Sequence, residues 1–181
     1  METAIDTHSV PEVLAADAGV FRNLWRTFGS AVALVSTEHD GSRHSMLATA
    51  ATSVSMDPPS LLVCVNRSAS AHAALKDRGA FALGIMPSAS HDIGAAIATS
   101  ASGQRFDHGH WNELCGTGDV TDGLPWLAES QATLFCSIGA SMDYGTHTIF
   151  VANVLHATGT SGDDPLLYCD GRFGRFSRIG Q

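Results

Sequence analysis

The stretch RHSMLATAATSVSMDPPSLLVCVNRSAS, residues 43–70, decides the fold and points to a site. Its small and hydroxyl-bearing residues, 48–55, lead into the break Pro58-Pro59, after which an apolar run predicts a strand over 61–65. That strand runs into Asn66-Arg67-Ser68. Small side chains let a flat ligand lie against the backbone, while hydroxyls and a guanidinium are suitable donors for a phosphate. The functional interpretation is a site for a flat ligand that carries a phosphate. The plain alternative, which composition alone favours, is an ordinary strand with its Thr and Ser side chains on a solvated face.

Working outward from this stretch, the chain predicts more strands than helices. The dipeptide Asp40-Gly41 favours a tight hairpin turn, because both residues tolerate a positive φ. Apolar runs predict further strands over 31–35, 81–85, 132–138, 147–156 and 166–169. Strands at this spacing, without regular βαβ alternation, favour a mostly β fold, a closed and largely antiparallel barrel, over a doubly wound parallel sheet.

The helices are expected to be few and short. A first helix is indicated by four apolar residues with the spacing of one helix face: Phe21, Leu24, Trp25 and Phe28. A second, capped by Ser68 or Ser70, is expected to end at Gly79, and a third to follow Pro87. Residues 1–18 show no clear pattern and are expected to be an N-terminal extension, with the domain spanning 19–181.

Composition excludes several classes of function. The formal net charge of −8 and the lack of a basic stripe argue against nucleic acid as a partner. The chain has no run of eighteen apolar residues, so no membrane span is predicted. It has no basic-then-apolar leader, so secretion is not predicted. The four cysteines are widely spaced, without a CxxC pair, which favours a reducing, cytoplasmic compartment and no structural metal.

Two other kinds of site are not predicted. The glycine cluster Gly116-Thr117-Gly118 lacks a third glycine and does not open an apolar helix, so a Rossmann dinucleotide site is not expected. The histidine pairs His108/His110 and His39/His44 lack the third and fourth ligands that a closed metal site needs.

Two later motifs each have a plain and a functional interpretation. His147 opens the string Gly145-Thr146-His147-Thr148-Ile149-Phe150-Val151, where a histidine is by default partly buried with a backbone partner. The segment 171–176, GRFGRF, is by default a turn at a solvated C-terminal end. Each motif also resembles a segment of a known flavin-binding family, and the resemblance implies that His147 could hydrogen-bond to the ligand and that Phe173 could stack near it.

Taken in order, these motifs resemble the flavin reductase-like family, the reductase components of two-component flavin-dependent monooxygenases. The resemblance runs from about Phe21 to Phe176. It implies an FMN-binding split barrel, a Greek-key antiparallel barrel with a few helices, working as a homodimer. The family's signature around the histidine has an acid where this chain has Thr146, and its histidine faces the flavin and the nicotinamide.

The resemblance also implies roles for particular residues. His147 would shape the nicotinamide side as the catalytic residue, and Phe173 would stack near the flavin. The remaining flavin-binding residues would be Ala48, Thr49 and Ala50 at the ring edge, Ser53 and Ser55 nearer the ribityl chain and phosphate, and Asn66, Arg67 and Ser70 at the phosphate.

The implied activity is hydride transfer from NADH to FMN, with reduced flavin diffusing to a partner monooxygenase. FAD in place of FMN stays open, as does NADPH, although no isolated basic pair marks a 2′-phosphate pocket. Three alternatives remain: a barrel that holds FMN and reduces another acceptor such as a corrinoid or ferric complex, a non-catalytic flavin-binding barrel, and a small metal-binding barrel using the histidine pairs.

Overall fold

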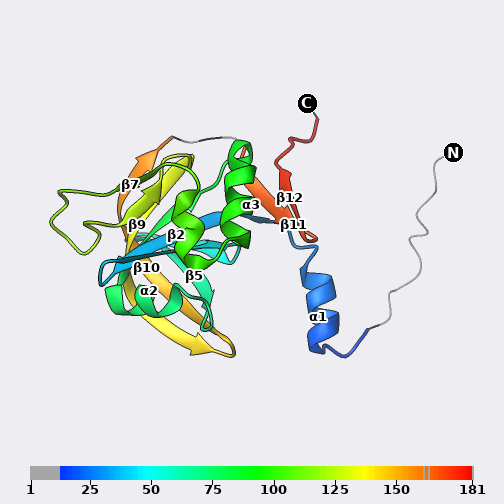
Figure 1. Cartoon of the computed structure of the whole chain (residues 1–181). Coiled ribbons are helices and arrows are strands. Elements are labelled where there is room, and N and C mark those ends of the chain that lie inside the picture. Colours follow the sequence, from blue (N-terminus) through cyan, green and yellow to red (C-terminus); the bar gives the residue numbers. More distant parts are fainter. Residues whose placement is uncertain (1–12, 161, 163, 181) are drawn as a thin grey trace.

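The computed structural model describes residues 13–160, 162 and 164–180 (Figure 1). Most of the expected N-terminal extension, residues 1–12, lies outside the described residues. Seven strands form one antiparallel sheet in the order β3-β2-β6-β9-β10-β5-β4. These strands are β2 (Ala33–His39), β3 (Ser42–Ala48), β4 (Ala51–Met56), β5 (Pro59–Asn66), β6 (Ala80–Ile85), β9 (Ala132–Tyr144) and β10 (His147–Gly159).

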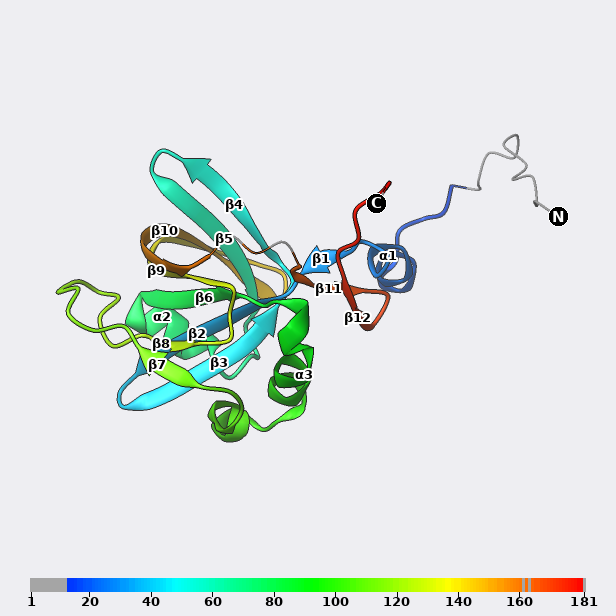
Figure 2. The same ribbon diagram turned by 90° about the horizontal axis from the view of Figure 1, so that it is seen from above.

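The sheet wraps around an apolar core, and one seam stays open. Phe81, Phe150, Val63 and Leu75 are at most 1% exposed and belong to this core. The edge strands β3 and β4 share no ladder within the described residues, and Figure 2 shows them on opposite sides of the barrel. The expected closed barrel is therefore wrong in this one respect: hydrogen bonds do not close it, as the term split barrel implies.

Two helices cover the barrel. α2 (His72–Arg78) buries Leu75 in the core and ends at Gly79, whose φ of 71° confirms the predicted glycine stop. The expected serine cap is wrong, because Ala71 occupies the N-cap and no side chain caps the helix. α3 (His91–Thr99) follows Pro87 through the short 3₁₀ turn η1 (Ser88–Ser90).

The region between α3 and β9 contains only short elements. They are the 3₁₀ helix η2 (Ser102–Asp107) and a two-stranded sheet of β7 (Trp111–Glu113) and β8 (Pro125–Leu127). Among the described residues, no helix is long and apolar enough to cross a membrane.

A second small sheet joins the barrel to the N-terminal helix. It contains β1 (Ser30–Ala31), β11 (Leu166–Cys169) and β12 (Arg172–Arg175) in the order β1-β11-β12. Figures 1 and 2 both show α1 (Ala18–Trp25) standing apart from the barrel beside this sheet. An ion pair between Arg26 Nε and Asp170 Oδ1, at 2.6 Å, ties the end of α1 to the β11–β12 turn.

The apolar face of α1 is not buried in the barrel. The rings of Phe21, Trp25 and Phe28 stack on one another, with centroids 5.6 and 4.9 Å apart. Trp25 is still 57% exposed and Phe28 62%. The face that the periodicity predicted is therefore real, but this chain alone does not cover it.

Candidate functional site

The pairing of β5, β10 and β9 brings three polar or aromatic side chains into one row. His147, the first residue of β10, lies opposite Asn66 of β5 and opposite Tyr144 of β9. Directly paired residues point to the same side of a sheet. The strand end at Asn66 and the strand start at His147, 81 residues apart in sequence numbering, therefore lie side by side.

Two further rows continue on the same side of the sheet. The second row is Cys64, Ile149 and Met142, and the third is Leu62, Val151 and Ala140. The residues between these rows along the strands, such as Val63 and Phe150, are buried in the core, so the rows face outward. We call these nine residues the outer face: Leu62, Cys64, Asn66, Ala140, Met142, Tyr144, His147, Ile149 and Val151.

A cavity of about 850 Å³ lies over part of the outer face, between it and α1. Leu62 and Cys64 line it from the sheet, and Trp25 lines it from the helix. Thr49 and Ala50, two of the predicted ring-edge residues, line it as well. The Ala50 carbonyl accepts a hydrogen bond of 2.9 Å from the Cys64 N–H, which fixes this turn beside β5. Small residues and a helix bearing aromatic rings thus border one hollow.

Arg67 fastens the β9–β10 turn to the end of β5. Its main-chain N–H donates to the Thr146 carbonyl at 2.9 Å, and its guanidinium Nη2 donates to the Gly145 carbonyl at 2.5 Å. The turn has only two residues between the paired Tyr144 and His147, and Gly145 adopts the positive φ, 56°, that such a turn needs. The position of His147 therefore depends on Arg67.

Donor groups remain available at this end of β5. Asn66 Oδ1 accepts from the N–H and the hydroxyl of Ser68, both at 2.9 Å, which leaves the Asn66 amide N–H₂ without a partner among the described residues. Ser70 is exposed three residues after Arg67, in the turn before α2. His147 is exposed, so its plain interpretation as a partly buried histidine is wrong.

A hydrogen-bonded chain holds α2 against the same hairpin. His72 Nε2 lies 2.8 Å from Thr148 Oγ1, and the Thr148 hydroxyl donates to Asp143 Oδ1 at 2.5 Å. The hydrogen bond from Thr148 is the largest cause that lowers the pKa of Asp143, and the positive charges of Lys76 and Arg67 lower it further. The β9–β10 hairpin is thus fixed both at its turn and along its strand.

Ser53 and Ser55 lie elsewhere. Ser53 pairs with the buried Leu61 and Ser55 pairs with Ser60, at the opposite end of β5 from Arg67. The five residue steps from Leu61 to Asn66 span roughly 17 Å. Both serines line a second cavity of about 400 Å³, which adjoins the larger one because Ala31, Ala51 and Thr52 line both. The Ser55 hydroxyl donates to the Asp57 carbonyl at 3.0 Å. The structure does not bring them to the phosphate donors that were expected to share their site.

Two other predicted residues are also set apart. Ala48 is 7% exposed and belongs to the core, so only its backbone could reach a ligand. Phe173 packs against the cluster around Leu166 and Met86 and lies edge-on to Tyr168, with ring centroids 5.5 Å apart. It lines a third cavity, of about 490 Å³, that the predicted ring-edge residues do not reach.

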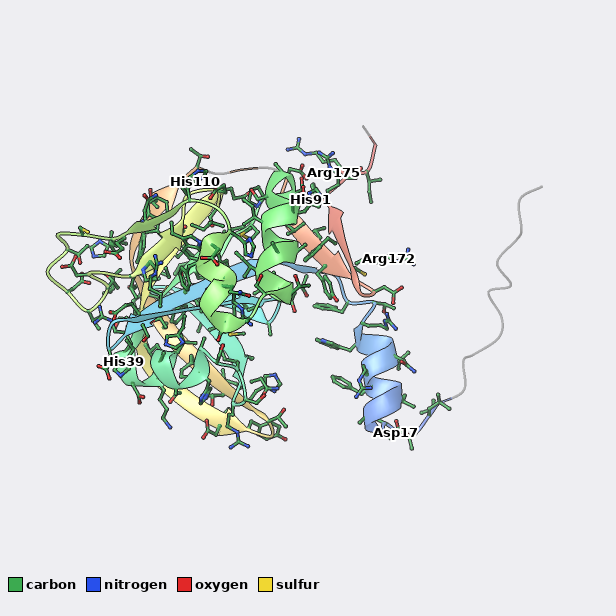
Figure 3. All side chains as sticks on the ribbon, in the orientation of Figure 1. Asp17, His39, His91, His110, Arg172 and Arg175 are labelled. Atoms are coloured by element: carbon green, nitrogen blue, oxygen red, sulfur yellow. The ribbon has the colours of Figure 1, made fainter. Side chains whose placement is uncertain are left out.

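The histidine pairs do not assemble a metal site in the part of the chain that the structure describes. No group of three or more His, Cys, Asp or Glu side chains has suitable geometry there. Figure 3 shows His39 on a different part of the barrel from His91 and His110. His110 instead pairs with Glu129 at 2.5 Å.

Comparison with known proteins then identifies the family. A family model described as the flavin reductase like domain matches residues 25–177. The chain belongs to this family. The match covers the barrel, both small sheets and the end of α1, so the family assignment rests on nearly the whole fold rather than on one motif.

Several relatives of this flavin reductase-like chain have assigned activities. FMN reductase (NADH) RutF of Pseudomonas syringae pv. syringae is 32% identical over 174 residues, covering 96% of this chain and 94% of the relative. The reductase component of a 4-nitrophenol 4-monooxygenase/4-nitrocatechol 2-monooxygenase of Rhodococcus opacus is 34% identical over 160 residues, covering 88% and 82%.

Solved structures agree on the fold. The NADH:FAD oxidoreductase SgcE6 of Streptomyces globisporus superposes with a TM-score of 0.82 at 28% identity, covering 94% of this chain and all of that one. BorF, the flavin reductase component of a bacterial two-component tryptophan halogenase, gives a TM-score of 0.77 at 29% identity, covering 90% and 99%. The split barrel predicted for this flavin reductase-like chain is confirmed.

Sequence reasoning missed three features of the site. Tyr144 and Cys64 share the outer face with His147, and the α1 rings form the far wall of the larger cavity. Alternation along the predicted strand gave a signal for Cys64, because Asn66, Cys64 and Leu62 are two residues apart. Tyr144 lies beyond the strand expected over 132–138 and had no such signal. Which strand lies beside which could not be obtained from that alternation.

Proposed function

We propose that this chain is an NAD(P)H:flavin oxidoreductase that uses NADH to reduce FMN or FAD and supplies reduced flavin to a separate monooxygenase. The observation that carries the proposal is the family match over residues 25–177. Relatives that are named as NADH-dependent FMN reductases and as reductase components of monooxygenases support it. The resemblance read from the motifs points the same way.

The donor set at the end of β5 fits a flavin. The outer face beside the small Ala50 can take a ring, and the Asn66 amide, the Arg67 guanidinium and the Ser70 hydroxyl offer donors for polar groups of the ligand. When bound, the flavin and the nicotinamide supply the hydride chemistry themselves.

The side chains of the protein therefore have to orient the flavin and the nicotinamide, and need not react themselves. We place His147 beside the rings, where an exposed imidazole can donate a hydrogen bond to the position at which negative charge develops. Arg67 and Ser70 bind the phosphate, and the backbone of Thr49 and Ala50 contacts the ring edge. Ser53, Ser55 and Phe173 are left out of this arrangement because they line other cavities.

A second copy of the chain completes the working protein in this proposal. The second and third rows of the outer face are apolar, and Met142 remains 57% exposed. The aromatic face of α1 borders the same hollow and is equally uncovered. Contiguous apolar surface of this kind is typical of a protein–protein interface. We therefore propose a homodimer in which the second copy covers the part of these rows that the flavin ring leaves free, with Asn66 and His147 at the rim.

We also propose the cytoplasm as its location. All four cysteines are free thiols in the structure, which suits a reducing compartment, and NADH is available there.

The direct test is NADH oxidation by the purified chain in air, with and without added FMN. Rapid oxidation that saturates with free FMN supports a reductase that releases reduced flavin. A yellow protein whose oxidation of NADH is not stimulated by free FMN would favour a tightly held cofactor and another electron acceptor. Absence of both flavin binding and NADH oxidation would contradict the proposal.

A further inference from the structure

Only one of the two ring nitrogens of His147 has a hydrogen-bond partner among the described residues. Its Nδ1 lies 2.9 Å from the hydroxyl oxygen of Thr146, the preceding residue. Its Nε2 has no partner among the described residues, and the side chain is exposed at the end of the outer face. A neutral imidazole carries one proton, so what Thr146 does at Nδ1 decides what Nε2 can offer to a ligand.

The backbone gives Thr146 little freedom. Its carbonyl accepts from the Arg67 N–H at 2.9 Å, and the Arg67 guanidinium holds the neighbouring Gly145 carbonyl. The turn is therefore attached to β5 at two consecutive carbonyls. This fixes the main chain from which the Thr146 hydroxyl reaches the imidazole. Within the described part of the chain, Nδ1 is the one polar atom that this hydroxyl contacts.

We infer that Thr146 is a positioning residue that selects the tautomer of His147. The hydroxyl donates to Nδ1, which leaves the ring proton on Nε2 and presents an N–H donor to the bound rings. This deepens the function proposed above and rests on it, because that function needs a donor where negative charge develops. A ring proton on Nδ1 would turn the exposed Nε2 into an acceptor, which has nothing to offer such a charge.

Nitrogen NMR of the ligand-free protein tests the tautomer without any turnover. Three uniformly ¹⁵N-labelled proteins are compared: wild type, Thr146→Ser and Thr146→Val, with the spectrum of His147→Gln identifying the His147 signals. Wild type and Thr146→Ser are expected to show Nε2 as the protonated nitrogen and Nδ1 as the bare one. The isosteric Thr146→Val removes the donor and is expected to give a mixture. A proton on Nδ1 in wild type, or an unchanged spectrum in Thr146→Val, would overturn the inference.

Single-turnover kinetics then test the consequence. Loss of one neutral hydrogen bond predicts hydride transfer to saturating flavin that is about two- to tenfold slower in Thr146→Val. Flavin affinity should stay unchanged, and Thr146→Ser should restore the rate. Thr158→Val, a matched change near the far end of β10, is the control for strand effects. Wild-type rates in Thr146→Val, despite a changed tautomer, would refute the positioning role.

The two proposals fail in different ways. If the wild-type chain oxidises no NADH with flavin, the proposed function is wrong and the reason for a donor at Nε2 disappears with it. If wild type is active while either measurement on Thr146→Val gives the wild-type result, the flavin reductase function stands and only the role of Thr146 is lost.

Discussion

Arg67 has two roles, one in holding the β9–β10 turn and one in the proposed phosphate site. Its main chain and its guanidinium hold the β9–β10 turn, while the guanidinium has further N–H groups that can reach a phosphate. A lysine could keep the charge but could not reproduce this planar geometry. Ligand binding and the placement of His147 are therefore linked through one side chain.

Replacing Arg67 by alanine should weaken flavin binding. A charge-assisted hydrogen bond to a phosphate is worth about 1.5–3 kcal/mol, so the flavin Kd should rise roughly ten- to hundredfold. Titration calorimetry with FMN measures it. Arg172→Ala, which removes another exposed guanidinium from β12, is the matched control (Figure 3). An unchanged Kd in Arg67→Ala would remove Arg67 from the site.

His147→Ala should affect the rate more than the affinity. An exposed ring at the edge of the site adds little to ground-state binding, but a donor to developing charge accelerates transfer. Stopped-flow reduction of bound flavin by NADH should slow by roughly ten- to hundredfold, with flavin Kd nearly unchanged. Equal rates in both proteins would show that His147 is only a strand-end residue.

The sequence could predict which residue types gather but not all of their positions. Asn66, Arg67 and His147 were found because each stands at the end of an apolar strand, where the chain leaves the sheet. Ser53 was expected near the phosphate, but it pairs with Leu61, at the opposite end of β5 from Arg67. The sequence pattern does not say which residue of β5 each residue of β4 lies opposite, and the register shift between Ser53 and Ser55 also moves Ser55 relative to its partner strand.

At the scale of elements, a side-chain pair holds the loop 114–124 to the barrel. Asp119 Oδ2 lies 2.7 Å from His156 Nε2 on β10, and Asp119 Oδ1 accepts from the hydroxyl and the N–H of Thr121. The hydrogen bond from the Thr121 hydroxyl, followed by that from His156, lowers the pKa of Asp119 from 3.8 to about 2. The carboxylate therefore acts as the attachment point of this loop.

This attachment predicts how stability depends on pH. Because folding lowers the pKa of Asp119, its contribution is present above about pH 4 and is lost as the pH falls towards 2. Asp119→Asn should lower the melting temperature at neutral pH and flatten its decline between pH 4 and 2. Thermal unfolding followed by circular dichroism measures both. Asp107→Asn, at an exposed carboxylate, should leave the curve unchanged, and an unchanged curve in Asp119→Asn would contradict the role of the pair.

Element boundaries were predictable where one physical signal dominates. Gly79 and the turn at Asp40-Gly41 were placed correctly because their backbones need a positive φ. The strand expected over 132–138 instead continues to Tyr144, and residues 172–175 form a strand. Both segments contain polar residues, so no apolar run predicted them as strands. Beyond Ile138, β9 leaves the core, and its pairing with β10 rather than burial keeps it extended.

For the whole molecule, the uncovered apolar rows and α1 predict self-association. Met142→Asp places a charge on an exposed position of the outer face, where it should disturb an interface without disturbing the core. Sedimentation velocity should give a dimer for wild type and a shift towards monomer for the variant. Ile179→Asp, at a fully exposed apolar residue near the C-terminus, is the control. A monomeric wild type would rule out the homodimer.

His147 and the apolar rows lie on the same side of the sheet. This arrangement has a consequence for activity assays. If His147 sits at the rim of a surface that a second copy covers, the number of working sites follows the fraction of chains that have found a partner. Turnover per milligram would then fall on dilution, recover on concentration, and show a lag after rapid dilution from a concentrated stock. Rate constants measured at a single low enzyme concentration would describe the association equilibrium as much as hydride transfer.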